Sequence, residues 1–205
     1  MKRRGFLLAV MGGALAGCEG LGGLLGPPAN LYTLTPKSNF AADLPTVASQ
    51  LVVEEPSAAG GLNSVRIALL RDGTELGHFA GAEWADRAPR MVQILLTESF
   101  ENTGRIVAVG RQAIGLRSDF NLMSELREFQ AEYSRAGGSP TVRVRLTAKL
   151  IRQPRRSIVD SQSFEANLPA GGADMRAIVL AFDEALGRVL RQVVEWCLRR
   201  MATGA

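Results

Sequence analysis

The sequence TVRVRLTAKLI at residues 141–151 alternates apolar and polar side chains from end to end. Successive side chains of a β-strand point to opposite faces of the sheet, so this pattern predicts a strand with one buried face and one exposed face. A clean alternation of this kind is typical of an antiparallel sheet that is covered on one side only. The stretch therefore predicts a layered fold in which helices cover one face of a sheet.

The polar face of this strand is cationic. It carries Arg143, Arg145 and Lys149, which would lie in a row on the solvent side. Such a row is a candidate docking face for a partner, although a simply solvated face is the more ordinary interpretation of exposed charges. After a turn at residues 153–156, residues 158–165 are expected to add a further strand.

The segment before this strand, residues 122–133, fits two patterns. Leu122, Leu126 and Phe129 have the spacing of a helical face, whereas residues 125–129 could form an edge strand with a bulge. The turn sequence GGSP that follows favours the strand, because it would join two antiparallel neighbours. Three glutamates would then face the cationic row and add modest cross-strand attraction: Glu125, Glu128 and Glu132.

A long amphipathic helix is predicted from about Asp174 to Arg199. The other side of this helix is charged, and the pairs Glu184–Arg188 and Glu195–Arg199 have favourable i,i+4 spacing. Acidic residues on the polar side argue against a lipid-seeking helix, so we expect its apolar stripe to pack on the sheet. The stripe consists of Ile178, Phe182, Ala185, Leu186, Val189, Val193 and Trp196.

The first half of the chain has shorter strand patterns. The tripeptide Arg-Asp-Gly at residues 71–73 is a turn signal that would join two of these runs as a hairpin. The β-prone runs lie at residues 31–34, 50–54, 65–70, 75–79 and 105–109.

A second helix is predicted between the last two of these strands. Asp86 is placed to cap its start, Pro89 is tolerated in the first turn, and Gly104 can end it in a left-handed conformation. A strand, a helix and a strand in close succession favour a right-handed crossover. Together the elements predict an α/β (α+β) two-layer sandwich, with a mixed, mostly antiparallel sheet and two main helices packed on one face. We expect this single domain to occupy residues 31–205.

The N-terminal segment has the three parts of an export signal. Basic residues 2–4 precede an apolar run of about 10 residues, which is too short to span ~30 Å of hydrocarbon as a helix. The segment then resembles the bacterial lipobox, at which a cysteine is acylated and the chain is cut just before it. The alternatives are an ordinary signal peptide cut elsewhere and a buried cysteine in an N-terminal helix. The lipobox residues are Leu15, Ala16 and Gly17, followed by Cys18 as the lipid attachment site.

On this interpretation residues 1–17 are a cleaved signal peptide. Residues 18–30 are a lipidated N-terminus and a Gly-rich flexible tether with a span of roughly 20 Å. Removing 17 of the 205 residues leaves 188, which suits a single domain. The 24 basic and 20 acidic residues become 21 and 20, because three basic residues leave with the signal. This balance gives nucleic-acid binding no compositional support.

Residues suited to catalysis are few and isolated. His78 is the single histidine and lies in a predicted strand, without a second histidine or a free cysteine near it in the sequence. Cys197 lies among apolar neighbours, where a cysteine packs as a small hydrophobe. The sequence also lacks a phosphate-binding loop and a Gly-x-Ser-x-Gly elbow. We therefore expect no enzyme activity, cofactor or metal site; the alternative is a hydrolase with an unrecognised site that includes His78 or Asp160.

Two further motifs carry a resemblance to a known family. Tyr32-Thr33-Leu34 forms an early strand, and residues 79–91, FAGAEWADRAPRM, place a Trp-Ala-Asp turn ahead of a helix. With the lipobox, the late pair of long strands and the closing helix, the chain resembles the ABC-type transport auxiliary lipoproteins, the PqiC-like group. It departs from the family pattern at His78, where a tyrosine is usual, and at Arg87, where a proline often follows the aspartate.

The resemblance implies a lipoprotein of a Gram-negative envelope. It would be the accessory or docking subunit of a lipid transport system in which an MCE-domain protein works with an inner-membrane permease and ATPase, and phospholipid is a candidate ligand. Glu19 stands where an inner-membrane retention signal would have aspartate, which implies the outer membrane and its periplasmic face. Trp84 matches the family motif and is a candidate partner contact, although a packing role is more usual for such a tryptophan. The alternatives are a lipid- or solute-binding periplasmic lipoprotein and a lipoprotein that assists outer-membrane assembly.

Overall fold

The computed structural model describes residues 28–111, 118–134 and 137–203. The lipobox and Cys18 therefore lie outside the described residues. The helices are α1 (Ala88–Glu101) and α2 (Met175–Thr203). The strands are β1 (Asn30–Tyr32), β2 (Val47–Val53), β3 (Ser57–Ala58), β4 (Arg66–Arg71), β5 (Glu75–Trp84), β6 (Ile106–Gly110), β7 (Phe120–Tyr133), β8 (Thr141–Arg152) and β9 (Ser157–Pro169).

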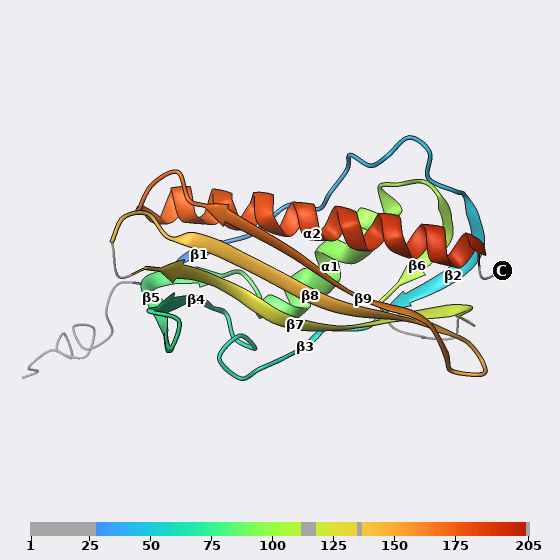
Figure 1. Cartoon of the computed structure of the whole chain (residues 1–205), viewed down its shortest axis with the longest axis horizontal. Coiled ribbons are helices and arrows are strands. Elements are labelled where there is room, and N and C mark those ends of the chain that lie inside the picture. The colour runs from blue at the N-terminus through green and yellow to red at the C-terminus, as the bar shows by residue number, and fades with distance from the viewer. Residues whose placement is uncertain (1–27, 112–117, 135–136, 204–205) are drawn as a thin grey trace, which may run out of the picture.

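All nine of these strands belong to one sheet, organised around β7. Strand β8 pairs with β7 along most of its length, and β9 continues the sheet on the far side of β8, both in antiparallel register. The other side of β7 is lined in turn by the parallel strands β2, β3 and β4. Figure 1 shows the two helices together on one face of this sheet. The expected two-layer architecture, with its longest ladders antiparallel, is confirmed.

Of the two alternatives for residues 122–133, a helix or an edge strand with a bulge, β7 confirms the strand and the bulge but not the edge position. The segment is a strand, and its register shifts between Leu126 and Glu128, which makes Arg127 the extra residue of a bulge. It is not an edge strand, because it has neighbours on both sides. The edge position failed as a prediction because the parallel partners come from distant parts of the chain.

The alternation in β8 places its side chains as expected. Val142, Val144 and Leu150 are buried beneath the helices, whereas the polar residues between them point to the uncovered face. The apolar stripe of α2 is also buried, and Phe182 of this stripe lies in an aromatic cluster with Trp84 and Phe129. No helix among the residues that the structure describes is both long and apolar enough to cross a membrane.

The ends of α1 agree with the prediction only in part. Its N-cap is Arg87, without a side-chain cap, so the predicted cap by Asp86 is wrong. The Asp86 carboxylate instead accepts the backbone N–H of Arg87 at 2.7 Å and lies 2.9 Å from Arg90 Nε. At the other end Gly104 has a φ of +59°, the left-handed conformation expected of it.

The connection from β5 through α1 to β6 joins strands of opposite direction. Strand β5 is antiparallel to β4, whereas β4, β7, β2 and β6 run parallel to one another. A right-handed crossover joins parallel strands, so that expectation is wrong. The helix nevertheless lies on the expected face, where it contacts α2, β2 and β6.

Residues 33–46, here called the strap, join β1 to β2 and follow the helices on the way. Their backbone N–H groups bond to helix side chains, and an ion pair fastens their far end. Figure 1 shows this segment in blue beside α2. The contacts are Thr35 N to Asp183 Oδ1 (2.7 Å), Lys37 N to Ser99 Oγ (2.9 Å), Ala41 N to Glu195 Oε1 (2.9 Å) and Arg199 to Asp43 (3.0 Å).

Candidate interaction surface

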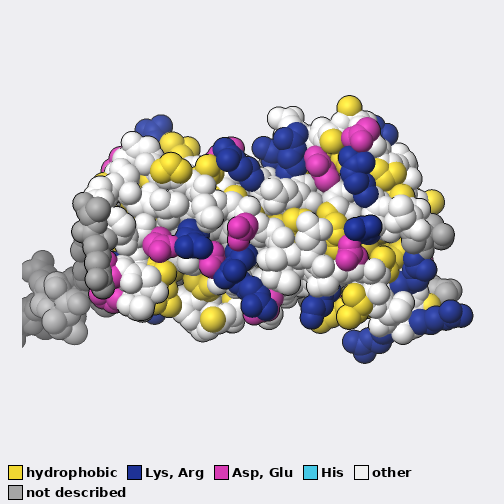
Figure 2. All heavy atoms as spheres, viewed as in Figure 1, with side chains coloured by type: hydrophobic (Ala, Val, Ile, Leu, Met, Phe, Trp, Pro, Cys, Tyr) yellow, Lys and Arg dark blue, Asp and Glu magenta, His cyan; other side chains and the backbone are white. Residues whose placement is uncertain are grey.

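The uncovered face of the sheet is the most polar surface that the long strands build. Side chains at every second position of β7, β8 and β9 point away from the helices and line this face. Figure 2 shows acidic and basic side chains next to one another in its middle, and basic side chains at the end where β8 turns into β9. The face is thus divided into a mixed part and a basic part.

The mixed part contains two members of the predicted cationic row. Arg145 donates to Glu128 Oε1 at 2.8 Å, and Arg143 donates to Glu132 Oε2 at 2.9 Å. Arg143 Nε also lies 3.3 Å from Glu128 Oε2. The hydrogen bond that Arg143 donates to Glu132 raises the pKa of Arg143, and the charges of Glu128 and Glu132 raise it further. Two arginines therefore meet two glutamates, and the row is neutralised within the sheet at these positions.

This pairing reflects the register of the sheet. Glu128 lies directly opposite Arg145, as cross-strand attraction predicts. Glu125 does not join, because its partner in β8 is Thr147; it pairs instead with Arg127 at 2.8 Å. Of the three glutamates expected to face the cations, two do so.

A shallow hollow adjoins the mixed part. This hollow lies beside Lys149 and has a volume of about 160 Å³. Ser57, Met123 and Thr147 also line it. A second hollow of about 330 Å³ lies beside Arg143. Apart from Met123, the residues that line the two hollows carry hydroxyl, amide or charged groups on their side chains. The hollows suit contact with a polar surface rather than burial of an acyl chain.

Lys149 differs from the two arginines. It is exposed, and no ion pair joins it to any carboxylate among the described residues. Of the predicted docking row, Lys149 alone therefore offers an uncompensated charge.

Trp84 has no part in this surface. It is 1% exposed, and its ring centroid lies 5.1 Å from that of Phe182 and 5.5 Å from that of Phe129. A side chain in this position cannot touch a partner of the folded protein. The role as partner contact is thus ruled out, and the packing alternative describes the residue.

The residues considered for catalysis contact other parts of the domain or are buried in it. His78 Nε2 lies 3.2 Å from the carbonyl oxygen of Gly61. Asp160 accepts a hydrogen bond from Trp196 and pairs with Arg200, and both contacts help to lower its pKa. Cys197 is buried, and desolvation raises the pKa of its thiol well above its ordinary value. A buried neutral thiol is a poor nucleophile.

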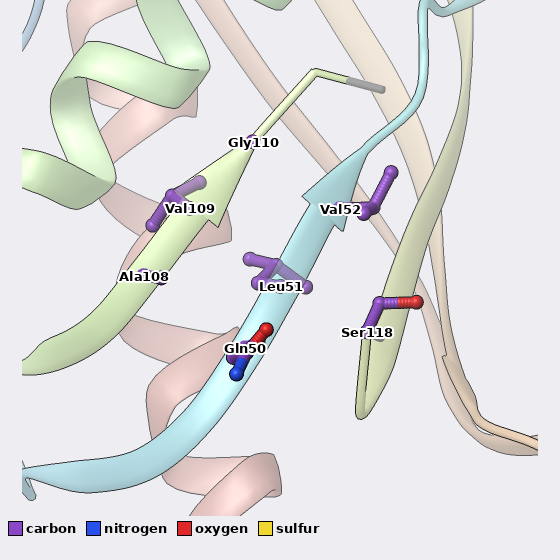
Figure 3. Close-up of a pocket in the computed structure, with 7 residues that line it drawn as sticks. All are labelled: Gln50, Leu51, Val52, Ala108, Val109, Gly110 and Ser118. Carbon is purple, nitrogen blue, oxygen red and sulfur yellow. The ribbon is translucent and has the colours of Figure 1, made fainter. Parts of the chain in front are cut away.

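A small cavity lies where β2 and β6 run side by side. Figure 3 shows Leu51 and Val52 on β2, Val109 and Gly110 on β6, and Ser118 beyond them. The volume is about 20 Å³, the size of a single water site, and is too small for a lipid chain.

The comparisons with known proteins agree with this architecture. A family model of ABC-type transport auxiliary lipoprotein components matches residues 32–194. The chain belongs to this family. An uncharacterized protein of Bradyrhizobium diazoefficiens is 29% identical over 185 residues, which are 90% of this chain and 49% of that protein. The chain therefore spans about half the length of this curated relative.

Solved structures of the same fold are also known. Protein XCC0632 from Xanthomonas campestris, of family DUF330, superposes with a TM-score of 0.81 at 32% identity, covering 86% of this chain and 98% of its own. A second, uncharacterized protein superposes with a TM-score of 0.65 at 14% identity, covering 82% and 97%. The first supports the family assignment, and the second shows the fold alone.

Proposed function

We propose that this protein is the lipid-anchored accessory subunit of an ABC-type system that moves lipids across the Gram-negative envelope. The family match over residues 32–194 carries the proposal, because the family consists of auxiliary lipoproteins of ABC-type transport. The protein would act through protein contacts, with no catalytic step of its own. Its partners would be an MCE-domain protein and, through it, an inner-membrane permease and ATPase.

The packing of the domain supports docking over lipid carriage. Trp84, Phe129 and Phe182 fill the space between sheet and helices, where a lipid chain would otherwise lie. The hollows described above are open and polar-rimmed. A subunit of this kind contributes a surface to the transport path rather than an internal site.

The membrane attachment is a further part of the proposal. Acylation of Cys18 would hold the domain to the membrane through residues 18–30. Because Glu19 stands where an inner-membrane retention signal would have aspartate, the sorting rule would send the protein to the outer membrane. The domain would then face the periplasm. Removal of residues 1–17 as a signal peptide belongs to the same proposal.

Crosslinking in intact cells tests the proposed function. The lipoprotein is captured after crosslinking, and its partners are identified by mass spectrometry. Recovery of an MCE-domain protein with its permease and ATPase is expected. Recovery of only an outer-membrane β-barrel, or of its assembly machinery, would contradict a role in transport.

A further inference from the structure

The turn between β8 and β9 carries arginines that pair with no carboxylate of the described residues. Arg155 and Arg156 are exposed, and no ion pair joins them to a carboxylate in the part of the chain that the structure describes. Arg152, at the end of β8, lies over the ring of Phe120 at 5.6 Å and has no carboxylate partner there either. Figure 2 shows basic side chains gathered at this end of the molecule.

Carboxylates on the neighbouring segments are occupied. Asp119 Oδ2 accepts the backbone N–H of Gln50 at 2.8 Å. Asp160 is held by Trp196 and Arg200 on the helix side of the sheet. The positive charge of the turn is thus left for a ligand outside the described chain.

Apolar side chains accompany these cations. Ile158 is 61% exposed and lies opposite Ile151 in the ladder, next to the turn. Met123, also exposed, lies opposite Lys149. Arginine and methionine are both enriched at protein interfaces, where arginine also binds carboxylates in bidentate fashion. We call the exposed residues of the uncovered face and of the turn at this end the distal patch: Met123, Lys149, Arg155, Arg156 and Ile158. Arg152 is not part of it, because it lies on the helix side of the sheet, against Phe120.

The backbone at Arg156 gives an independent reason to assign its side chain a role. Its φ is +53°, in the left-handed region, where a Cβ is disfavoured and glycine is the usual residue. The turn thus holds a charged side chain at a position where glycine would be conformationally easier.

The position of the distal patch separates it from the anchored end. Strand β1, which begins two residues after the start of the described chain, lies at the opposite end of the molecule from the β8–β9 turn (Figure 1). Helix α2 runs between the two ends, and its 29 residues correspond to about 44 Å. A tether with a span of roughly 20 Å would keep β1 near the membrane, and the length of α2 lets the patch reach well beyond that span.

From these observations we infer that the distal patch docks an acidic, partly apolar surface of another subunit of the transport system. The inference rests on the proposed function. Carboxylates of the partner would pair with Arg155 and Arg156, and Ile158 would be buried in the contact. A membrane surface offers anionic groups as well, but the location of the patch away from the anchor favours a protein.

Site-specific photocrosslinking tests the inference in the full-length, membrane-attached protein. A photoreactive amino acid replaces Ile158 in one variant and Leu180 in the other; both residues are 61% exposed, but Leu180 lies on α2. Crosslinks from position 158, and not from position 180, to the MCE-domain protein or the permease are expected. The variant Arg155→Glu/Arg156→Glu should lower this crosslink at least tenfold, whereas Arg176→Glu, an exposed arginine at the start of α2, should leave it unchanged.

The other outcomes distinguish failure of the distal patch from failure of the proposed function. Crosslinks to a transport subunit from position 180 only would overturn the distal patch and leave the proposed function standing. A phospholipid adduct at position 158, without a protein adduct, would show that the patch binds a membrane surface. If neither probe nor general crosslinking recovers any transport subunit, the proposed function fails together with the inference.

Discussion

The indole nitrogen of Trp196 donates a hydrogen bond of 3.0 Å to Asp160 Oδ2. Arg200 pairs with the same carboxylate, and the Trp196 ring packs at 5.4 Å, centroid to centroid, against Phe164. The last turns of α2 are thereby joined to the edge strand β9, whose other side has no strand partner among the described residues. This contact orients the hairpin that carries the distal patch.

The first prediction concerns pH. The hydrogen bond from Trp196, followed by that from the Ser161 backbone and the charge of Arg200, lowers the pKa of Asp160 from 3.8. A lowered folded-state pKa contributes stability that is present above the unfolded pKa and is lost as pH falls through the folded value. The melting temperature of the parent should therefore exceed that of Asp160→Asn at pH 6, and the difference should shrink as pH falls below 4. A difference that is constant across this range would contradict the assignment.

The second prediction concerns the aromatic core. Phe182 is fully buried between Trp84 and Phe129, so Phe182→Ala should lower the free energy of unfolding by about 3–5 kcal/mol. The melting temperature should fall on the order of 10 °C. The control is Leu180→Ala on the exposed side of the same helix, which should change stability by no more than about 0.5 kcal/mol. Equal effects of the two changes in denaturant unfolding would show that α2 is placed wrongly.

The third prediction compares two glutamates of β7. The Glu128 side chain is 15% exposed and faces both Arg143 and Arg145, whereas that of Glu125 is 48% exposed and pairs with Arg127 alone. Glu128→Ala leaves two partly buried guanidinium groups short of a partner and should cost about 1–2 kcal/mol. Glu125→Ala should cost less than about 0.5 kcal/mol. Urea unfolding of the two variants measures both values, and the reverse order would refute the pairing.

How far the sequence predicts this structure depends on the range of the interactions. The alternation in residues 141–151 and the stripe of α2 are local patterns, and both identify the buried face correctly. The partners of charged side chains, in contrast, often come from distant parts of the chain. Glu195 and Arg199 have ideal i,i+4 spacing, yet Glu195 binds Arg191 and Ala41 N, and Arg199 binds Asp43, which is 156 residues away. The strap that brings Asp43 to the helix has no periodic pattern, and nothing in its sequence indicated that course.

The candidate interaction surface was likewise predictable where it depends on a local pattern, and not where it depends on contacts between distant segments. The pattern of β8 identified the outward face of Arg143, Arg145 and Lys149, but not which of them are neutralised, because this depends on the register with β7. The arginines at residues 155 and 156 appeared only as part of a turn. Their significance comes from the distance between that turn and β1, which a one-dimensional pattern does not contain.

The fourth prediction concerns Cys197. Burial raises the pKa of its thiol well above 9.0, so the thiolate is scarce and inaccessible at pH 8. Iodoacetamide should leave the Cys197 peptide unmodified in the native protein and alkylate it fully in denaturant, as judged by mass spectrometry. Glutathione added to the same solution reports that the reagent is active. Rapid modification of the native protein would contradict the burial of this residue.

The last prediction concerns the anchor and uses the two cysteines as a matched pair. Because acylation at a lipobox requires the thiol, Cys18→Ser should abolish incorporation of labelled palmitate and release the protein from the membrane fraction. Cys197→Ser, which removes the other thiol of the chain, should leave the label and the fractionation unchanged. Intact mass of the parent should show the fatty acids at Cys18 as a new N-terminus. A Cys18→Ser protein that still sediments with membranes, together with a parent that carries no fatty acid, would show that the attachment does not depend on this cysteine.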